Sequence, residues 1–204
     1  DDFASALDRA REHCPDVLIE QRAPGDDLRL VVIDGRVVAA ALRRPAEVVG
    51  TGDRTVRELV VAQSRRRASA THGESSIPLD DVTERTVAEA GWDLDSTLPE
   101  GERVQVRRTA NLHTGGTIHD VTADVHPALK DVAVTTAAAI DIPVTGIDLL
   151  VPDVAGTDYV FIEANERPGL ANHEPQPTAA AFVDLLFPST TAVPWAWTPD
   201  GGEA

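Results

Sequence analysis

Cysteine is almost absent from this 204-residue sequence, in which Cys14 is the only one. A single cysteine excludes a disulfide framework within the chain and fits a protein of the reducing cytoplasm. Long apolar runs are absent too: none approaches the ~18 residues of a membrane-spanning helix, and the first residues show no signal-peptide pattern. We therefore expect a cytoplasmic protein without a membrane partner.

Basic residues are scarce, with 18 Lys and Arg against 34 Asp and Glu, and Lys130 is the only lysine. The formal net charge of −16 would repel DNA, RNA and anionic membranes, so we expect no nucleic-acid partner. An acidic surface suits divalent cations, although plain solubility is the commoner explanation. The oligomeric state stays open, and a homo-oligomer is one possibility.

Hydrophobic residues make up 42% of the chain, enough for one substantial core or for two small lobes that share a cleft. Strand-like and helix-like segments alternate, which favours an α+β or α/β fold. Strands are predicted at 16–21, 28–33, 36–44, 102–108, 144–152 and 158–165, with a hairpin turn at Asp34-Gly35. Helices are predicted at the start of the chain, from a Thr55/Glu58 capping box to about Ala70, from Asp80 to near Gly91, from Pro127 to about Ile140, and at 178–187. Residues 45–53 and 109–120 are predicted loops, and 188–204 a tail.

Three oxygen-bearing side chains stand near the ends of two predicted strands. Glu163 and Asn165 are two residues apart, so they point to the same side of a strand, about 6.6 Å apart along it. If the preceding strand pairs with this one, Asp148 can face the same spot. Such hard ligands suit Mg²⁺ or Mn²⁺ rather than zinc, and the small number of carboxylates suggests that nucleotide phosphates complete the coordination. The alternative is a strand-end acid at Asp148 and a turn former at Asn165.

Two other clusters are interpreted as structural. The histidines His113, His119 and His126, with Asp120 and Asp124, match no closed zinc pattern, so loop histidines that bond to backbone are expected. The run SRRRA at 64–68 suggests either an anion-binding patch or a solvated helix face, and we favour the solvated face.

Several stretches resemble the ATP-grasp family. GIDLLVPD, followed by FIEANERPGL, resembles the metal-binding end of that fold, and VLIEQRAPGDDLRLVVIDGRVVAAALRR resembles its hinge and antiparallel sheet. VVGTGDRTVRELV and RRTANLHTGGTIHDVTADVHP resemble the subgroup of cyanophycin synthetases and bifunctional glutathione synthetases. Within it, RRTANLHTGGTIHDVT and NERPGLANHEPQPT are most similar to bacterial N-acetylglutaminylglutamine synthetases. The resemblance covers residues 12–187.

The resemblance implies a carboxylate–amine ligase that uses ATP and Mg²⁺ or Mn²⁺. ATP would phosphorylate a substrate carboxylate, and an amine would displace the phosphate from the acyl phosphate to form an amide. The implied substrates are small molecules, namely amino acids or N-acyl amino acids. Two alternatives stay open: a non-catalytic nucleotide-binding module, and a cyanophycin- or glutathione-type ligase with other substrates. A kinase is disfavoured because no H-R-D pattern is present.

The resemblance also assigns roles to individual residues. Asp148, Glu163 and Asn165 would hold two Mg²⁺ ions against the phosphates, with Glu163 bridging them. The adenine and ribose contacts would come from Glu20, Gln21, Arg22, Ala23 and Asp27. Phosphate or substrate contacts would come from Arg108, Asn111, the backbone N–H groups of Gly115 and Gly116, Arg29, Arg43, Arg167 and His173.

One expected feature of the family is missing. ATP-grasp proteins place two phosphate-contacting lysines before the hinge strand, whereas this chain has no lysine before Lys130. We therefore expect residues 1–187 to be the carboxy-terminal part of an ATP-grasp domain, with a lysine-bearing part upstream in the same protein. By itself this portion should bind Mg-ADP weakly and should not ligate.

Overall fold

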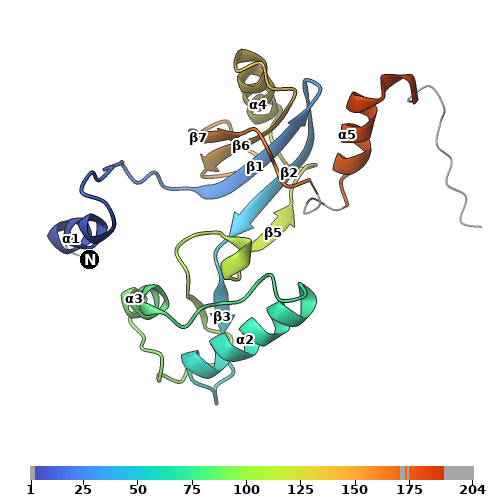
Figure 1. Ribbon diagram of the computed structural model, residues 1–204. Helices are drawn as coiled ribbons and strands as arrows, with labels where there is room; N and C mark the ends of the chain where they lie inside the picture. Colours follow the sequence, from blue (N-terminus) through green and yellow to red (C-terminus); the bar gives the residue numbers. More distant parts are fainter. Residues whose placement is uncertain (1–2, 171–172, 174, 191–204) are drawn as a thin grey trace, which may run out of the picture.

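The computed structural model describes residues 3–170, 173 and 175–190. Its centre is a five-stranded antiparallel sheet in the order β5-β2-β1-β6-β7 (Figure 1). The strands are β1 (Asp26–Ile33), β2 (Arg36–Arg44), β5 (Thr117–Asp120), β6 (Val144–Val151) and β7 (Val160–Asn165). The expected fold class, an antiparallel sheet with helices packed on it, is thus confirmed.

The hairpin between β1 and β2 forms where the sequence predicts it. Asp34 and Gly35 both adopt positive φ angles, 51° and 69°, as a tight turn matching the twist of the strands requires. The turn fixes the register that opposes Asp27 to Arg43 and Leu30 to Ala40. On the other side of β1, β6 pairs so that Arg29 opposes Asp148.

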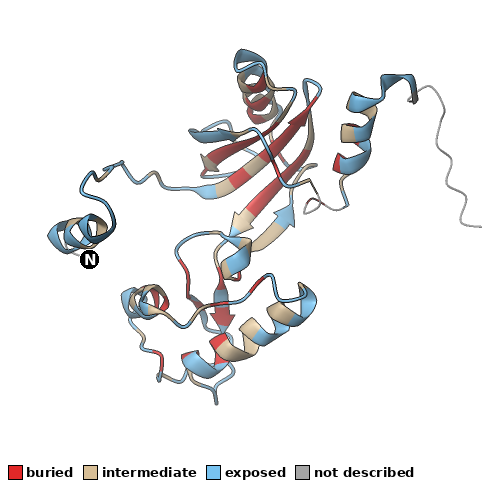
Figure 2. Ribbon diagram, viewed as in Figure 1, coloured by how far each residue is buried: buried red, intermediate tan, exposed pale blue. Residues whose placement is uncertain are grey.

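The central sheet has two chemically different faces. Alternate residues of β1, among them Leu28 and Leu30, are fully buried beneath helix α4 (Pro127–Ala139). That helix presents Leu129, Ala133 and Ala137 at four-residue spacing, and Figure 2 shows the buried strip along its inner side. The opposite face carries Asp27, Arg29, Arg43 and Asp148 near β6, while its other part is covered by α5 (Thr178–Leu186).

A smaller lobe lies below the sheet in Figure 1. It contains the two-stranded ladder of β3 (Glu47–Val49) and β4 (Arg103–Gln105), with helices α2 (Val56–Ala70) and α3 (Asp81–Glu89). Both predicted helix starts are confirmed: Thr55 and Glu58 form a reciprocal capping box, and the Asp80 side chain accepts from the Thr83 N–H group. The lobe has its own apolar core, which includes Val56, Val60, Val87, Leu98 and Val104.

The predicted strand at 16–21 is wrong. The chain there forms no regular structure and pairs with no described strand, and Leu18 and Ile19 are 80% and 64% exposed. Apolar character alone does not make a strand where no neighbour offers hydrogen bonds. Helix α1 (Phe3–His13) lies at the far end of this segment in Figure 1 and has no buried residue.

Two predicted loops contain regular structure. Residues 47–49 form β3, and the segment 109–120 contains the 3₁₀ turn η1 (Leu112–Thr114) followed by β5. Conversely, the strand expected over 102–108 is limited to β4. A second 3₁₀ turn, η2 (Pro188–Thr190), follows α5, and the rest of the predicted tail, residues 191–204, lies outside the described residues. In the described part of the chain, no helix is both long and apolar enough to span a bilayer.

Candidate functional site

Asp148 lies at the centre of the charged face of the sheet and is only 3% exposed. Arg29, directly opposite on β1, grips both carboxylate oxygens: Nε contacts Oδ1, and Nη2 lies 2.6 Å from Oδ2. Arg43 reaches the same Oδ2 from β2, with its Nη2 at 2.9 Å. One buried carboxylate therefore holds two guanidinium groups, a geometry that fixes both arginines.

Asp27 pairs with Arg43 from the side, with its Oδ1 2.9 Å from Nε and 2.7 Å from Nη2. Burial raises the pKa of Asp27 above its ordinary value, and this effect outweighs the lowering by Arg43. Burial alone would lower the pKa of Arg43, but its hydrogen bond to Asp27 and the attraction of Asp148 raise it instead. Arg43 therefore carries a firmly held positive charge.

Glu163 and Asn165 stand beside Asp148, as their spacing predicts. The β6–β7 register opposes Asp148 to Glu163 and Gly146 to Asn165, with an irregularity next to Asp148. The side-chain nitrogen of Asn165 lies 3.0 Å from Glu163 Oε1 and 3.5 Å from Asp148 Oδ2. The three side chains thus converge on one spot.

Gly146 is part of this arrangement, although the sequence reasoning did not single it out. A Cβ atom there would lie 3.1 Å from both Arg29 Cδ and Pro168 Cβ. A side chain would therefore press on the arginine that grips Asp148. The only sequence signal was a glycine inside a strand, which often marks a close approach.

The three oxygen-bearing side chains have the chemistry of a magnesium site, but they are not equally available to a metal ion. Glu163 is exposed and bonded to Asn165, whose Oδ1 and Nδ2 exchange places on a half-turn of the amide. Asp148, by contrast, already neutralises two guanidiniums, so a cation there would share or compete for its oxygens. Among the described residues no group of three or more His, Cys, Asp or Glu could hold a metal, so the site rests on two carboxylates and an amide.

A cavity of about 410 Å³, here called the sheet cavity, opens beside this cluster. It brings together five residues to which the sequence assigned roles, far apart along the chain: Asp27, Arg29, Arg43, Asn111 and His173. The loop 109–113, Ile118 and Gly169 complete its wall. No sequence signal indicated the apolar part of this wall.

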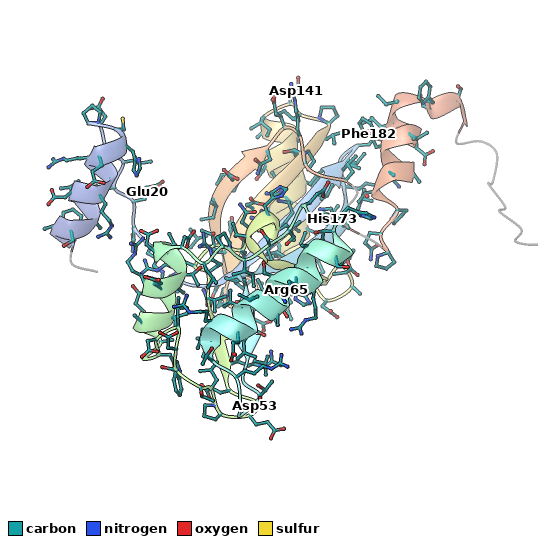
Figure 3. The ribbon with its side chains drawn as sticks, turned by 60° about the horizontal axis from the view of Figure 1, so that its bottom comes forward. Glu20, Asp53, Arg65, Asp141, His173 and Phe182 are labelled. Carbon is teal, nitrogen blue, oxygen red and sulfur yellow. The ribbon has the colours of Figure 1, made fainter. Side chains whose placement is uncertain are left out.

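His173 is the least exposed of the polar groups in the wall, with 5% of its surface accessible. Its Nδ1 atom is buried and has no hydrogen-bond partner among the described residues. Burial lowers the pKa of His173, Arg29 and Arg43 lower it further by repulsion, and Asp120 opposes them. Figure 3 shows the side chain close to the sheet. A neutral imidazole with a free ring nitrogen therefore stands at the cavity.

An adjoining cavity of about 420 Å³ shares Asp27, Arg43, Thr109 and Ala110 with the sheet cavity. Of the residues assigned to the nucleotide, Arg22 and Ala23 line it together with Asp27, and Arg108 does so from the opposite side. The guanidinium of Arg108, however, pairs with Glu89 of α3. The two cavities together give a continuous polar surface along one face of the sheet.

Three other residues to which the sequence assigned ligand contacts lie outside both of these cavities. Glu20 and Gln21 are exposed and line neither cavity, and Figure 3 places Glu20 on the segment that leads away to α1. Arg167 is also exposed, with Glu166 as its neighbour at 3.6 Å. These three residues are therefore not assembled with the others in this structure.

Asn111 and the glycine pair have structural partners. The Asn111 side chain caps η1 by accepting from the His113 N–H group at 2.8 Å. The N–H groups of Gly115 and Gly116 donate to the carbonyl groups of Leu112 and Asn111, at 3.1 and 2.9 Å. Both N–H groups are used within the turn in this structure, and a phosphate contact by either residue stays a prediction.

His113 and His126 hydrogen-bond to backbone groups, as the sequence interpretation expects. The Nδ1 atom of His113 lies 3.1 Å from the Glu74 carbonyl oxygen, and that of His126 accepts from the Ala128 N–H group at the start of α4. His119 contacts the Thr117 hydroxyl. None of these contacts indicates a zinc site.

Comparison with known proteins decides the fold. Residues 102–181 match the family of the RimK-like ATP-grasp domain. Over 92% of the chain, the structure superposes on a bifunctional glutathione synthetase from Pasteurella multocida, with a TM-score of 0.67 and 30% identity. The chain has the ATP-grasp fold. The superposition covers 28% of that larger protein.

Curated relatives agree with this ATP-grasp assignment. The chain is 34% identical over 199 residues to cyanophycin synthetase from Nostoc, covering 91% of this chain and 22% of the relative. It is 31% identical over 207 residues to the glutathione biosynthesis bifunctional protein from Streptococcus thermophilus, covering 94% and 28%. The chain thus spans about a quarter of the length of these relatives.

Proposed function

We propose that this chain forms the metal end and part of the nucleotide cleft of an ATP-dependent carboxylate–amine ligase. The observation that carries the proposal is the convergence of Asp148, Glu163 and Asn165 beside two arginines that line a cavity. Phosphoryl transfer requires positioned phosphates and neutralised charge more than a protein nucleophile. The charged face of the sheet supplies groups suited to both tasks.

Within this proposal, Arg29 and Arg43 bind the acyl phosphate or the substrate carboxylate. Their guanidinium groups are held from behind by Asp148, so their remaining N–H groups are oriented toward the sheet cavity. Glu163 and Asn165, with Asp148, would hold Mg²⁺, which when bound offsets the negative charge of the phosphates. Asp27, which lines both cavities, would accept hydrogen bonds from ribose hydroxyls.

The substrates are the finer part of the proposal. Relatives named for cyanophycin and glutathione synthesis support joining an amino acid to another small molecule through an amide bond. The stretches around Asn111 and His173 favour N-acetylglutaminylglutamine as the product. Because the chain spans 22% and 28% of those relatives, the reaction is proposed for a longer protein that supplies the phosphate-contacting lysines.

A non-catalytic nucleotide-binding module is the second candidate. The full pairing of Asp148 with two arginines favours it, since that carboxylate is already neutralised without a metal. This module would bind nucleotide without transferring its phosphate.

The decisive test uses the full-length protein with ATP, Mg²⁺ and paired substrates, including N-acetylglutamine with glutamine, and mass spectrometry of the products. We expect an amide product together with ADP. The variant Glu163→Gln should raise the Mg²⁺ concentration for half-maximal rate by roughly 10–100-fold. Glu166→Gln is the matched control, because Glu166 is an exposed acid just after β7 and should leave the titration unchanged.

Two outcomes would count against the ligase. ADP release that no acceptor converts into an amide product would favour the second candidate or a simple ATPase. Identical Mg²⁺ titrations for wild type and Glu163→Gln would remove Glu163 from the metal site.

A further inference from the structure

A third cavity, of about 420 Å³, lies between α2 and the strands β2–β5 and is called here the α2 cavity. Its charged and titratable lining consists of four arginines, one histidine and one carboxylate: Arg44, Arg66, Arg67, Arg103, His119 and Glu47. Apolar walls come from Pro45, Val48, Val49 and Leu59. The SRRRA run is therefore only partly a solvated helix face, because two of its three arginines line a cavity.

The α2 cavity is separate from the sheet cavity because it opens on the opposite side of the β2–β5 pair. Side chains alternate along a strand, so Thr117 and His119 point away from Ile118. Thr117 and His119 line the α2 cavity, whereas Ile118 lines the sheet cavity. On β2, Arg44 lines the α2 cavity and its neighbour Arg43 lines the sheet cavity.

Helical spacing explains which arginines of α2 take part. Leu59, Gln63 and Arg66 or Arg67 follow one another at intervals of three or four residues, so they share one side of the helix. Arg65, labelled on α2 in Figure 3, is exposed as Arg66 is, but it does not line the cavity. The same run thus contains two cavity arginines and a natural control.

The charge in the α2 cavity is not balanced. Of its four arginines, only Arg103 forms an ion pair with a described carboxylate, that of Glu47. Arg66 donates to the neutral side chain of Gln63 at 2.7 Å, and Arg44 and Arg67 have no carboxylate partner among the described residues. In a chain with 34 acidic and 18 basic residues, positive charge left unpaired around a cavity is unexpected.

We propose that the α2 cavity binds a small ligand with at least two negative charges, carried by phosphate or carboxylate groups. Guanidinium forks match both groups bidentately. The lining contains no Phe, Tyr or Trp side chain, and the imidazole of His119 is its only aromatic ring. A compact anion therefore suits the arginines better than a second nucleotide does. The proposal does not depend on the proposed ligase site, although Arg44 and Pro45 also line the cavity that adjoins the sheet cavity.

Residue-level protection tests the proposal directly. The full-length protein is treated with phenylglyoxal, which modifies accessible arginines, with and without inorganic pyrophosphate or citrate at constant ionic strength. Modification at each arginine is mapped by mass spectrometry. We expect the anion to slow modification of Arg66 and Arg67 several-fold and to leave Arg65 unchanged, and the more protective probe identifies phosphate or carboxylate as the preferred group. Equal slowing at all three arginines, or at none, would overturn the site.

Variants give an independent readout by calorimetry without nucleotide. Arg66→Gln with Arg67→Gln should weaken binding of the more protective probe at this site by about tenfold or more, whereas Arg65→Gln should change it by less than about twofold. Equal losses in both variants would indicate general electrostatic attraction and overturn the proposal. Glu163→Gln should bind the probe normally, so failure of the proposed ligase and failure of this site give different results.

Discussion

Arginines line both the sheet cavity and the α2 cavity, but the two cavities differ in how many of these arginines pair with a carboxylate. In the sheet cavity, Arg29 and Arg43 are held by Asp148, and Asp27 adds a second partner. In the α2 cavity, Arg44 and Arg67 meet no described carboxylate. The two cavities differ in charge balance more than in size, since their volumes are about 410 and 420 Å³.

This difference suggests two uses of the same side chain. An arginine fixed by a carboxylate is oriented before any ligand arrives, so it suits a site in which geometry determines the rate. An arginine without a partner keeps its full attraction for an anion but loses more side-chain freedom when that anion binds. The sheet cavity is thus arranged for positioning and the α2 cavity for charge-driven binding.

The largest loss of stability should come from removing the carboxylate of Asp148, which pairs with both arginines of the sheet cavity, whereas no described carboxylate is shared in this way by arginines of the α2 cavity. Asp148→Asn leaves two partly buried guanidiniums without their shared partner, so we expect a loss of about 3 kcal/mol in the free energy of unfolding, measured with denaturant. Glu163→Gln is the control: it alters the neighbouring exposed acid and should change stability by less than about 0.5 kcal/mol. Equal effects of the two variants would show that Asp148 does not organise the arginines.

The sequence predicts the centre of this arrangement because strand spacing is local information. Two-residue spacing puts Glu163 and Asn165 on one side, and a short connection predicts that Asp148 comes beside them. The grip of Arg29 on Asp148 could not be predicted in the same way. Those residues are 119 positions apart, and only the β1–β6 register, set by packing of the whole sheet, brings them together.

The failed predictions share one physical cause, which is that a strand requires a neighbour. Residues 16–21 have strand-like composition but no pairing partner in the described part of the chain, whereas the polar segment 117–120 becomes β5 because the edge of β2 is available. The role of the glycine pair stays a prediction. Glycine indicates a special backbone position, but not whether a ligand or a neighbouring side chain requires it.

Gly115 offers the next test, because it lines the α2 cavity at a φ angle of 91°. A Cβ atom there would lie 2.4 Å from Cγ1 of the buried Ile77, so Gly115→Ala adds a clash to backbone strain and should cost about 2 kcal/mol of stability. Gly73→Ala is the matched control, since Gly73 has a φ of 92° but nothing within 4 Å of its Cβ position, and should cost about 1 kcal/mol. Equal destabilisation in thermal unfolding would mean that Ile77 yields and that packing does not restrict this wall.

The smallest effect is on the pH dependence of the free energy of unfolding. It is tested by comparing Asp27 of the sheet cavity with Asp80 of the small lobe. Each aspartate pairs with one close arginine, Asp27 with Arg43 and Asp80 with Arg107 at 2.6 Å. Partial burial alone would raise the pKa of Asp80, but the Thr83 N–H group and Arg107 hold that pKa below its ordinary value of 3.8. At Asp27 the effect of burial is larger than that of Arg43, so the pKa of Asp27 lies above 3.8. The two groups therefore contribute to the pH dependence with opposite signs.

The signs follow from proton binding in the folded and unfolded chains. Asp80 binds its proton less readily when folded, so its contribution to stability is present above pH 3.8 and is lost as the pH falls through its folded pKa. Asp27 binds its proton more readily when folded, so its contribution declines as the pH rises from 3.8 through its folded pKa. Asp80→Asn, which keeps a good helix cap, should therefore lessen the loss of stability on acidification, and Asp27→Asn should make that loss steeper. Denaturant unfolding at several pH values between about 3 and 6 measures both slopes, and slopes that change in the same direction would show that burial does not distinguish the two pairs.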